Sequence, residues 1–133
     1  MTQHASGKFE VKVAPLALED NTDPTLGRMS LDKQYQGDLE GTGRGEMLTA
    51  GGPAKGSGAY VAIERVSGTL QGRSGSFVLQ HGGTMTPSAS HLAITVVPDS
   101  GTGQLEGITG SLTIKIDHGQ HSYELDYSLP ATP

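Results

Sequence analysis

Cysteine and tryptophan are both absent from this 133-residue chain. The lack of cysteine excludes disulfides, thiolate nucleophiles and Cys-ligated metal sites, and it is compatible with a reducing compartment, so we expect a cytoplasmic protein. No stretch approaches the roughly 18 consecutive apolar residues of a membrane-spanning helix, and the first residues hold no apolar run of signal-peptide length. We therefore expect neither membrane insertion nor export.

Positive charge is also scarce, because nine Lys and Arg stand against fourteen Asp and Glu, for a net charge of −5. The basic residues form no cluster along the chain. A phosphate backbone would be repelled by such a chain rather than bound. We expect no nucleic-acid partner.

Glycine, in contrast, is abundant, with twenty residues spread through the chain rather than gathered in a linker. Hydrophobic residues make up 34% and recur along the whole length. A chain of this size is served by one hydrophobic core, so we predict a single domain over residues 1–133.

Alternation of apolar and polar residues is the dominant pattern, as in the run from His4 to Val13, where Phe9, Val11 and Val13 share one face. No helix of ordinary length is indicated. The expected strands cover approximately residues 4–13, 28–36, 38–49, 59–70, 74–86, 92–97, 104–117 and 120–129. This pattern predicts an all-β fold, a single antiparallel barrel of about eight strands.

A five-residue motif, G-x-L-x-G, occurs three times at expected junctions between strands, with offsets of 31 and 35 residues. The copies are 37–41, 68–72 and 103–107, and the second and third continue alike, with Gly75-Ser76 matching Gly110-Ser111. Some matches arise by chance in a glycine-rich chain, but the shared continuation favours a repeated hairpin. Glycines at such corners let long strands bend as a closed barrel requires.

Several segments resemble a bacterial family of unknown function. They are Gly27–Lys33, Gly45–Leu48, Gly56–Met85, with its Tyr60-Val-Ala-Ile-Glu-Arg-Val66 run, and Val96–Gly110. The resemblance implies an eight-stranded barrel of the allene oxide cyclase type, a lipocalin-like architecture whose interior can hold a small apolar ligand. Relatives of that type include plant allene oxide cyclases, dirigent proteins and bacterial cyclases. No catalytic residue carries over, because the matched motifs are the structural glycine corners.

Candidate site residues come from polar side chains that share a strand face with apolar ones. On residues 74–86, His81 alternates with Phe77 and Leu79, and an imidazole there can act as a general acid or base. On residues 59–70, one face leads from Val61 and Ile63 to Arg65, and the other joins Tyr60 to Glu64. The sequence leaves open which of these faces points inward.

Two carboxylates, Glu46 and Glu64, would have raised pKa values if buried, which suits proton abstraction. The alternative is a solvated position on the outer face, or an ion pair with Arg44 or Arg65. The ligand-binding candidates are therefore Glu46, Tyr60, Glu64, Arg65 and His81. The other tyrosines, Tyr35, Tyr123 and Tyr127, are the type of residue that lines small-ligand pockets, although ordinary wall packing is the better explanation for each one taken singly.

We expect no metal and no cofactor. His118 and His121 are three apart, so on a strand they face opposite sides, and no acidic residues follow a ligand spacing. Gly72-Arg-Ser-Gly75 precedes a strand rather than a helix, so it is not the nucleophile elbow of a serine hydrolase. Gly101-Thr-Gly103 is a turn and not a dinucleotide-binding loop.

Three functions remain compatible with these features. The first is binding of a small apolar or amphipathic molecule in the barrel interior. The second is an isomerase or cyclase that uses Glu46, Glu64 or His81 for one proton transfer. The third is a homo-oligomeric structural module whose outer apolar residues, as in Tyr60–Ile63 and Ser76–Leu79, form contacts between subunits.

Overall fold

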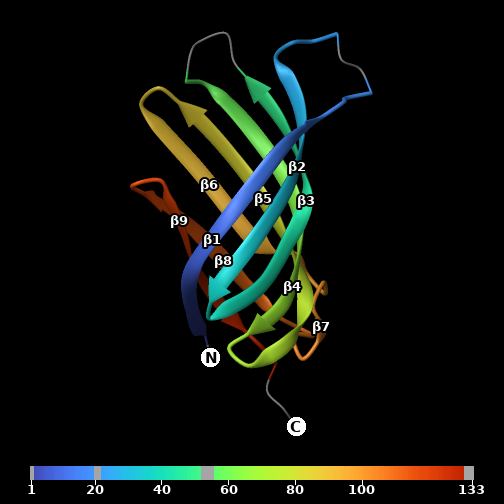
Figure 1. Cartoon of the computed structure of the whole chain (residues 1–133), viewed down its shortest axis with the longest axis vertical. Helices are drawn as coiled ribbons and strands as arrows, with labels where there is room; N and C mark the ends of the chain where they lie inside the picture. The colour runs from blue at the N-terminus through green and yellow to red at the C-terminus, as the bar shows by residue number, and fades with distance from the viewer. Residues whose placement is uncertain (1, 20–21, 52–55, 131–133) are drawn as a thin grey trace.

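The structure, a computed structural model, describes residues 2–19, 22–51 and 56–130. It consists of antiparallel strands and short turns (Figure 1). The strands are β1 (Gln3–Leu16), β2 (Leu26–Gly37), β3 (Leu39–Gly51), β4 (Gly58–Leu70), β5 (Arg73–Thr86), β6 (Ala89–Val96), β7 (Thr102–Gly103), β8 (Thr109–Asp117) and β9 (Gln120–Ser128). No helix in the described part of the chain is long and apolar enough to cross a membrane.

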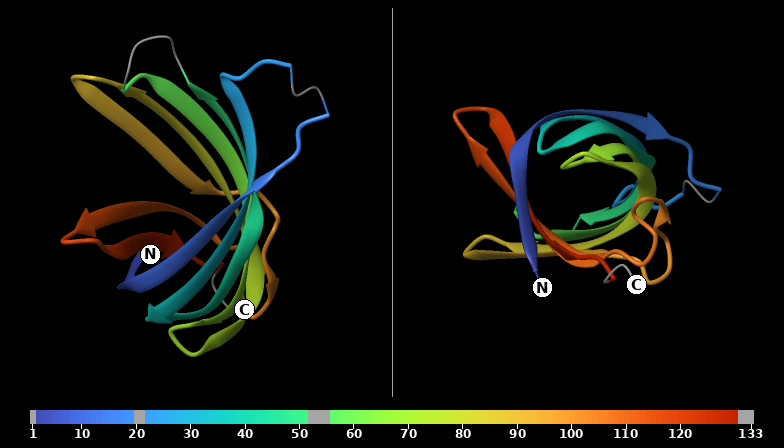
Figure 2. Two further views of the ribbon diagram at one scale, coloured as in Figure 1. Left: turned by 45° about the horizontal axis from the view of Figure 1, so that its top comes forward. Right: turned by 90° about the horizontal axis from the view of Figure 1, so that it is seen from below.

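The strands form one sheet in the order β4-β3-β2-β1-β9-β8-β6-β5, which closes on itself because β4 also pairs with β5. The short strand β7 adds to β5 outside this ring. The predicted eight-stranded antiparallel barrel is therefore confirmed, with one extra strand outside. Figure 2 shows the ring of strands from below.

One expected strand, 104–117, is wrong at its start. The chain pairs briefly as β7, then turns through 104–107, and β8 begins only at Thr109. Gly103, where β7 ends, and Gly107, at the end of the turn, have φ values of +59° and +81°, left-handed conformations that interrupt strand geometry. Periodicity alone could not detect this turn, because Leu105 and Ile108 are as buried as strand residues.

The three G-x-L-x-G copies lie at the lower end of the barrel in Figure 1, at the β2–β3, β4–β5 and β7–β8 junctions. Their central residues, Leu39, Leu70 and Leu105, are all buried, with 1%, 0% and 1% exposure, and they close that end with the core. The glycines let backbones approach, since a Cβ on Gly41 would lie 2.1 Å from the Ser67 carbonyl oxygen. The motif therefore builds the closed end.

The opposite end of the barrel is held together less completely. Strands β6 and β8 pair at only two positions, Ile94 with Leu112 and Thr95 with Ser111. Beyond that point the β5–β6 and β8–β9 hairpins diverge, as the left view of Figure 2 shows. The space between them leads into the barrel interior.

Candidate functional site

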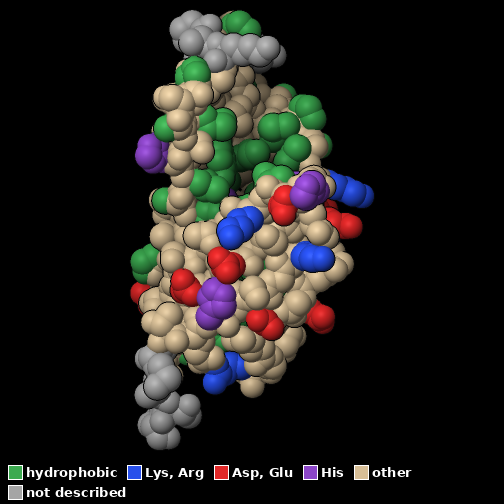
Figure 3. All heavy atoms as spheres, turned by 90° about the vertical axis from the view of Figure 1, so that its left-hand side faces the viewer, with side chains coloured by type: hydrophobic (Ala, Val, Ile, Leu, Met, Phe, Trp, Pro, Cys, Tyr) green, Lys and Arg blue, Asp and Glu red, His purple; other side chains and the backbone are tan. Residues whose placement is uncertain are grey.

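A cavity of about 270 Å³ occupies the open half of the barrel. Its lining residues come from all eight strands of the ring: Phe9, Val11, Val13, Leu31, Lys33, Met47, Tyr60, His81, Leu92, Ile114, Ile116 and His121. Several of these side chains, including Val13, Leu92 and Ile116, remain about half exposed or more, so the cavity is open to solvent. Figure 3 shows hydrophobic side chains in a hollow in the upper half of the molecule.

Glu64 is the centre of a buried polar cluster beside this cavity. Its side chain is fully buried, and its Oε1 atom lies 3.0 Å from Lys33 Nζ and 2.9 Å from His81 Nε2. Its Oε2 atom accepts a hydrogen bond of 2.5 Å from the Tyr35 hydroxyl. Lys33 and His81 also line the cavity, whereas Glu64 lies behind them. We call Lys33, Tyr35, Glu64 and His81 the Glu64 cluster.

The room for this carboxylate comes from β3, whose inward positions Gly41, Gly43 and Gly45 carry no side chain. A Cβ on Gly43 would lie 1.9 Å from Glu64 Oε2 and 2.9 Å from the ring of Tyr35. Inward glycines on one strand therefore create the space that a charged residue on the next strand fills.

The charges of the Glu64 cluster stabilise the carboxylate. Burial by itself would raise the pKa of Glu64, but the hydrogen bond from His81, the charge of Lys33 and the hydrogen bonds from Tyr35 and Lys33 outweigh burial and hold the pKa below its ordinary value. The expectation of a raised pKa for a buried Glu64 is therefore wrong. Burial, together with the Glu64 charge and hydrogen bond, raises the pKa of Tyr35 well above its ordinary value.

The ammonium of Lys33 is held by aromatic faces as well as by Glu64. Its Nζ lies 5.0 Å from the centre of the Phe9 ring and 5.7 Å from that of Tyr35. Such cation–π contacts stabilise a desolvated ammonium. Lys33, 4% exposed, is therefore a charged residue built into the interior.

Three of the five candidate residues lie together in the interior. Glu64 and His81 are hydrogen-bonded, and the Tyr60 ring lies 6.3 Å from the His81 ring, between centres, on the cavity wall. The inward face of β4 is thus the one that carries Tyr60 and Glu64.

The other two candidates, Glu46 and Arg65, lie on the outer face and are not part of the interior site. Arg65 follows Glu64 directly and so points to the opposite side, where it bonds the Ser76 hydroxyl at 3.4 Å. Glu46 forms an ion pair of 2.5 Å with Arg28. Alternation along β3 and β4 separates these side chains from the cavity.

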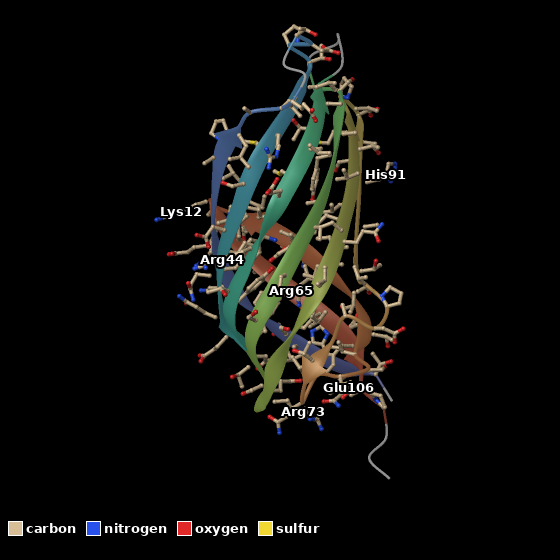
Figure 4. The ribbon with its side chains drawn as sticks, turned by 90° about the vertical axis from the view of Figure 1, so that its right-hand side faces the viewer. Lys12, Arg44, Arg65, Arg73, His91 and Glu106 are labelled. Carbon is tan, nitrogen blue, oxygen red and sulfur yellow. The ribbon has the colours of Figure 1, made fainter. Side chains whose placement is uncertain are left out.

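These outer residues border a shallow groove that also holds Leu48, Val61 and Ile63, each about half exposed. Arg44 and Arg65 are direct cross-strand neighbours there, and Figure 4 shows both on this outer face. The groove is separate from the interior cavity, because it lies on the other side of the sheet.

Sequence reasoning missed Lys33 as a site residue, although the signal was present. Lys33 alternates with Leu31 and Tyr35 on an otherwise apolar face, which is the pattern that singled out His81. His121 was also missed, since it was judged only as a metal ligand; its ring lies 5.2 Å from that of Phe9, between centres, on the cavity wall. Within the described residues, no three His, Asp or Glu side chains form a metal-binding group.

Comparison with known proteins relates the chain to one family. The family model described as "Protein of unknown function (DUF3224)" matches residues 5–127. A crystal structure of a DUF3224 protein of unknown function from Shewanella oneidensis MR-1 is 46% identical, with a TM-score of 0.92, and the match covers 98% of this chain and 100% of that one. A search of curated proteins found no match. The chain therefore belongs to the DUF3224 family of proteins of unknown function.

Proposed function

We propose that this protein binds a small apolar or amphipathic molecule inside its barrel. The observation that carries the proposal is the 270 Å³ cavity, whose wall is apolar except for Lys33, Tyr60, His81 and His121. Small-molecule sites are typically concave and mostly apolar, with a few placed polar groups that orient the ligand. The divergence of β6 from β8 supplies the route of entry.

A cavity-filling substitution tests this proposal. Ile114→Trp places a large side chain in the cavity, and Val61→Trp, on the exposed outer face of β4, is the matched control. Native mass spectrometry of each purified protein, before and after denaturation, and titration with a hydrophobic fluorescent probe measure binding. We expect wild type and Val61→Trp to bind and Ile114→Trp to lose binding. Probe binding that Ile114→Trp leaves unchanged would contradict the proposal.

The alternative function, an isomerase or cyclase, stays a prediction. So does the resemblance to allene oxide cyclases on which it is based. Glu46 lies outside the barrel and can take no part in an interior reaction. Glu64 is hydrogen-bonded by three side chains, so the residue left for proton transfer is His81.

Self-association through the outer groove is a second candidate, favoured by the exposure of Leu48, Val61 and Ile63. Apolar side chains grouped on a surface mark interaction sites. The rim carries both signs of charge, with Arg44 and Arg65 near Asp32 and Glu46, so a second copy can offer complementary groups. Sedimentation analysis of wild type and of Val61→Ser/Ile63→Ser tests it: a wild type that stays monomeric at high concentration rules this candidate out.

A further inference from the structure

The Lys33 ammonium has fewer acceptors than donors. It carries three N–H donors, and among the described residues its one oxygen acceptor is Glu64 Oε1, at 3.0 Å. The rest of the group faces the Phe9 and Tyr35 rings and borders the cavity. A buried cation with unused donors at a cavity wall fits a ligand that brings an acceptor.

His81 offers a second polar atom to the same space. An ionised carboxylate only accepts hydrogen bonds, so the His81 nitrogen next to Glu64, Nε2, carries the proton. The other nitrogen, Nδ1, has no hydrogen-bond partner in the described chain. No fully buried side-chain nitrogen or oxygen there lacks a partner, so Nδ1 reaches open space, and His81 lines the cavity. Nδ1 accepts a hydrogen bond when His81 is neutral and donates one when it is protonated.

We propose that the cavity binds a medium-length alkyl carboxylate, with its carboxylate between Lys33 Nζ and His81 Nδ1, and that binding takes up one proton on His81. This inference rests on the proposed binding function and names its ligand class. At the polar wall of the cavity Lys33 has unused donors and His81 donates from Nδ1 once it is protonated, while the acceptor Glu64 lies behind them. A carboxylate fits these donors better than a cation or a neutral polar group does.

Because of charge balance, binding of a carboxylate is coupled to the uptake of a proton. Lys33 and Glu64 neutralise each other, so an added carboxylate leaves the site with one uncompensated negative charge unless His81 is protonated. The titratable groups that face His81 are Glu64 and Tyr60 on β4 and Lys33 on β2, and β6 places Ile94 opposite it. Affinity for the carboxylate is therefore expected to rise with the proton concentration.

The cavity volume limits the length of the ligand. At about 30 Å³ for each water-sized group, 270 Å³ holds about nine non-hydrogen atoms. Octanoate, with eight carbons and two oxygens, is close to this size, and its chain would lie along Val11, Leu31 and Ile114 toward the gap between β6 and β8.

Calorimetric titration with octanoate and with 1-octanol, its neutral analogue, tests the inference. We expect octanoate to bind at least tenfold more tightly than octanol at pH 6. We also expect the affinity for octanoate to fall by at least threefold from pH 6 to pH 8. Titrations in buffers of different ionisation enthalpy should show that the protein takes up protons when octanoate binds. Equal affinities for octanoate and octanol, or an affinity that does not change with pH, would overturn this inference and leave the proposed function standing. Binding of neither probe, by wild type or by Val61→Trp, would count against both.

The variant that assigns the preference to Lys33 is Lys33→Met/Glu64→Gln, which removes both charges together and so leaves no unpaired charge in the interior. It is expected to bind octanol as wild type does and to lose the tenfold preference for octanoate. Val61→Trp, on the outer face, retains that preference. A carboxylate preference that survives in the double variant would overturn the placement on Lys33, and circular dichroism verifies that the variant is folded.

Discussion

His81 Nε2 lies 2.9 Å from Glu64 Oε1, between adjacent strands and with both side chains buried. Because the Glu64 pKa is held below its ordinary value, the carboxylate is ionised at neutral pH and Nε2 must donate. We predict that neutral His81 carries its proton on Nε2 and none on Nδ1. Long-range proton–nitrogen correlation by NMR distinguishes the two nitrogens. The exposed His91 serves as the reference, and an Nδ1-protonated tautomer of His81 would show that Glu64 does not orient the ring.

Glu64 and Lys33 are predicted to be strongly coupled in stability. Glu64→Gln leaves the Lys33 ammonium without its carboxylate and is expected to cost about 3–5 kcal/mol, the usual effect of breaking a buried ion pair. Lys33→Met leaves Glu64 without its ammonium, and the double variant removes both charges, so it should cost less than the sum of the two. Denaturant unfolding of the four proteins measures the coupling. Costs that add to within about 0.5 kcal/mol would mean that the pair does not interact.

The contribution of Glu64 depends on pH in a defined direction. A carboxyl whose pKa is lowered by folding contributes stability that is present above the unfolded value, about 4.5, and is lost as the pH falls through the folded value. The difference in unfolding free energy between wild type and Glu64→Gln is therefore expected to shrink as the pH falls below about 4.5. Unfolding series at several pH values measure it, and a difference that grows as the pH falls below about 4.5 would reverse the sign of the shift.

Gly43 is predicted to be required for space rather than for backbone conformation. Gly43→Ala places a Cβ 1.9 Å from Glu64 Oε2, so the carboxylate must move, at a cost of about 1–3 kcal/mol. Gly51→Ala, on the same strand, meets only the Thr25 carbonyl oxygen at 3.9 Å and is the matched control. Thermal unfolding compares them, and equal midpoints would show that the space at Gly43 is not needed.

Tyr123 is predicted to hold the closed end of the barrel together. Its hydroxyl accepts from the Leu39 amide at 2.9 Å and donates to the Gln36 carbonyl at 2.9 Å. Tyr123→Phe leaves that amide without its partner, which is expected to cost about 1–3 kcal/mol. Tyr127→Phe is the control, since its hydroxyl bonds flexible side chains, those of Gln3, Gln71 and Arg73. Hydrogen exchange of the Leu39 amide measures the loss of this hydrogen bond locally. If Tyr123→Phe left the protection of that amide unchanged, the structural role of the Tyr123 hydroxyl would be contradicted.

Much of the strand arrangement depends on local sequence and could be predicted. Alternation of period two correctly placed Leu31, Lys33 and Tyr35 on one face of β2, and the repeated G-x-L-x-G motif correctly marked three junctions. Side chains on a strand alternate whatever surrounds them, so these features are readable from a single segment.

The candidate site was predicted only in part. The pattern selected Glu64, His81 and Tyr60 but also Glu46 and Arg65, because alternation gives two faces to each strand and does not say which one is inside. It passed over Lys33, whose role depends on a carboxylate 31 residues away.

The sequence by itself therefore determined most of the strands, the glycine corners and the residues that share a face. Only the tertiary structure decided which faces enclose the interior, that Glu64 pairs with Lys33 and His81, and that β6 and β8 part to leave a cavity. The physical reason is that these properties come from pairing between strands distant in sequence, and closure of the ring fixes inside and outside for all strands at once.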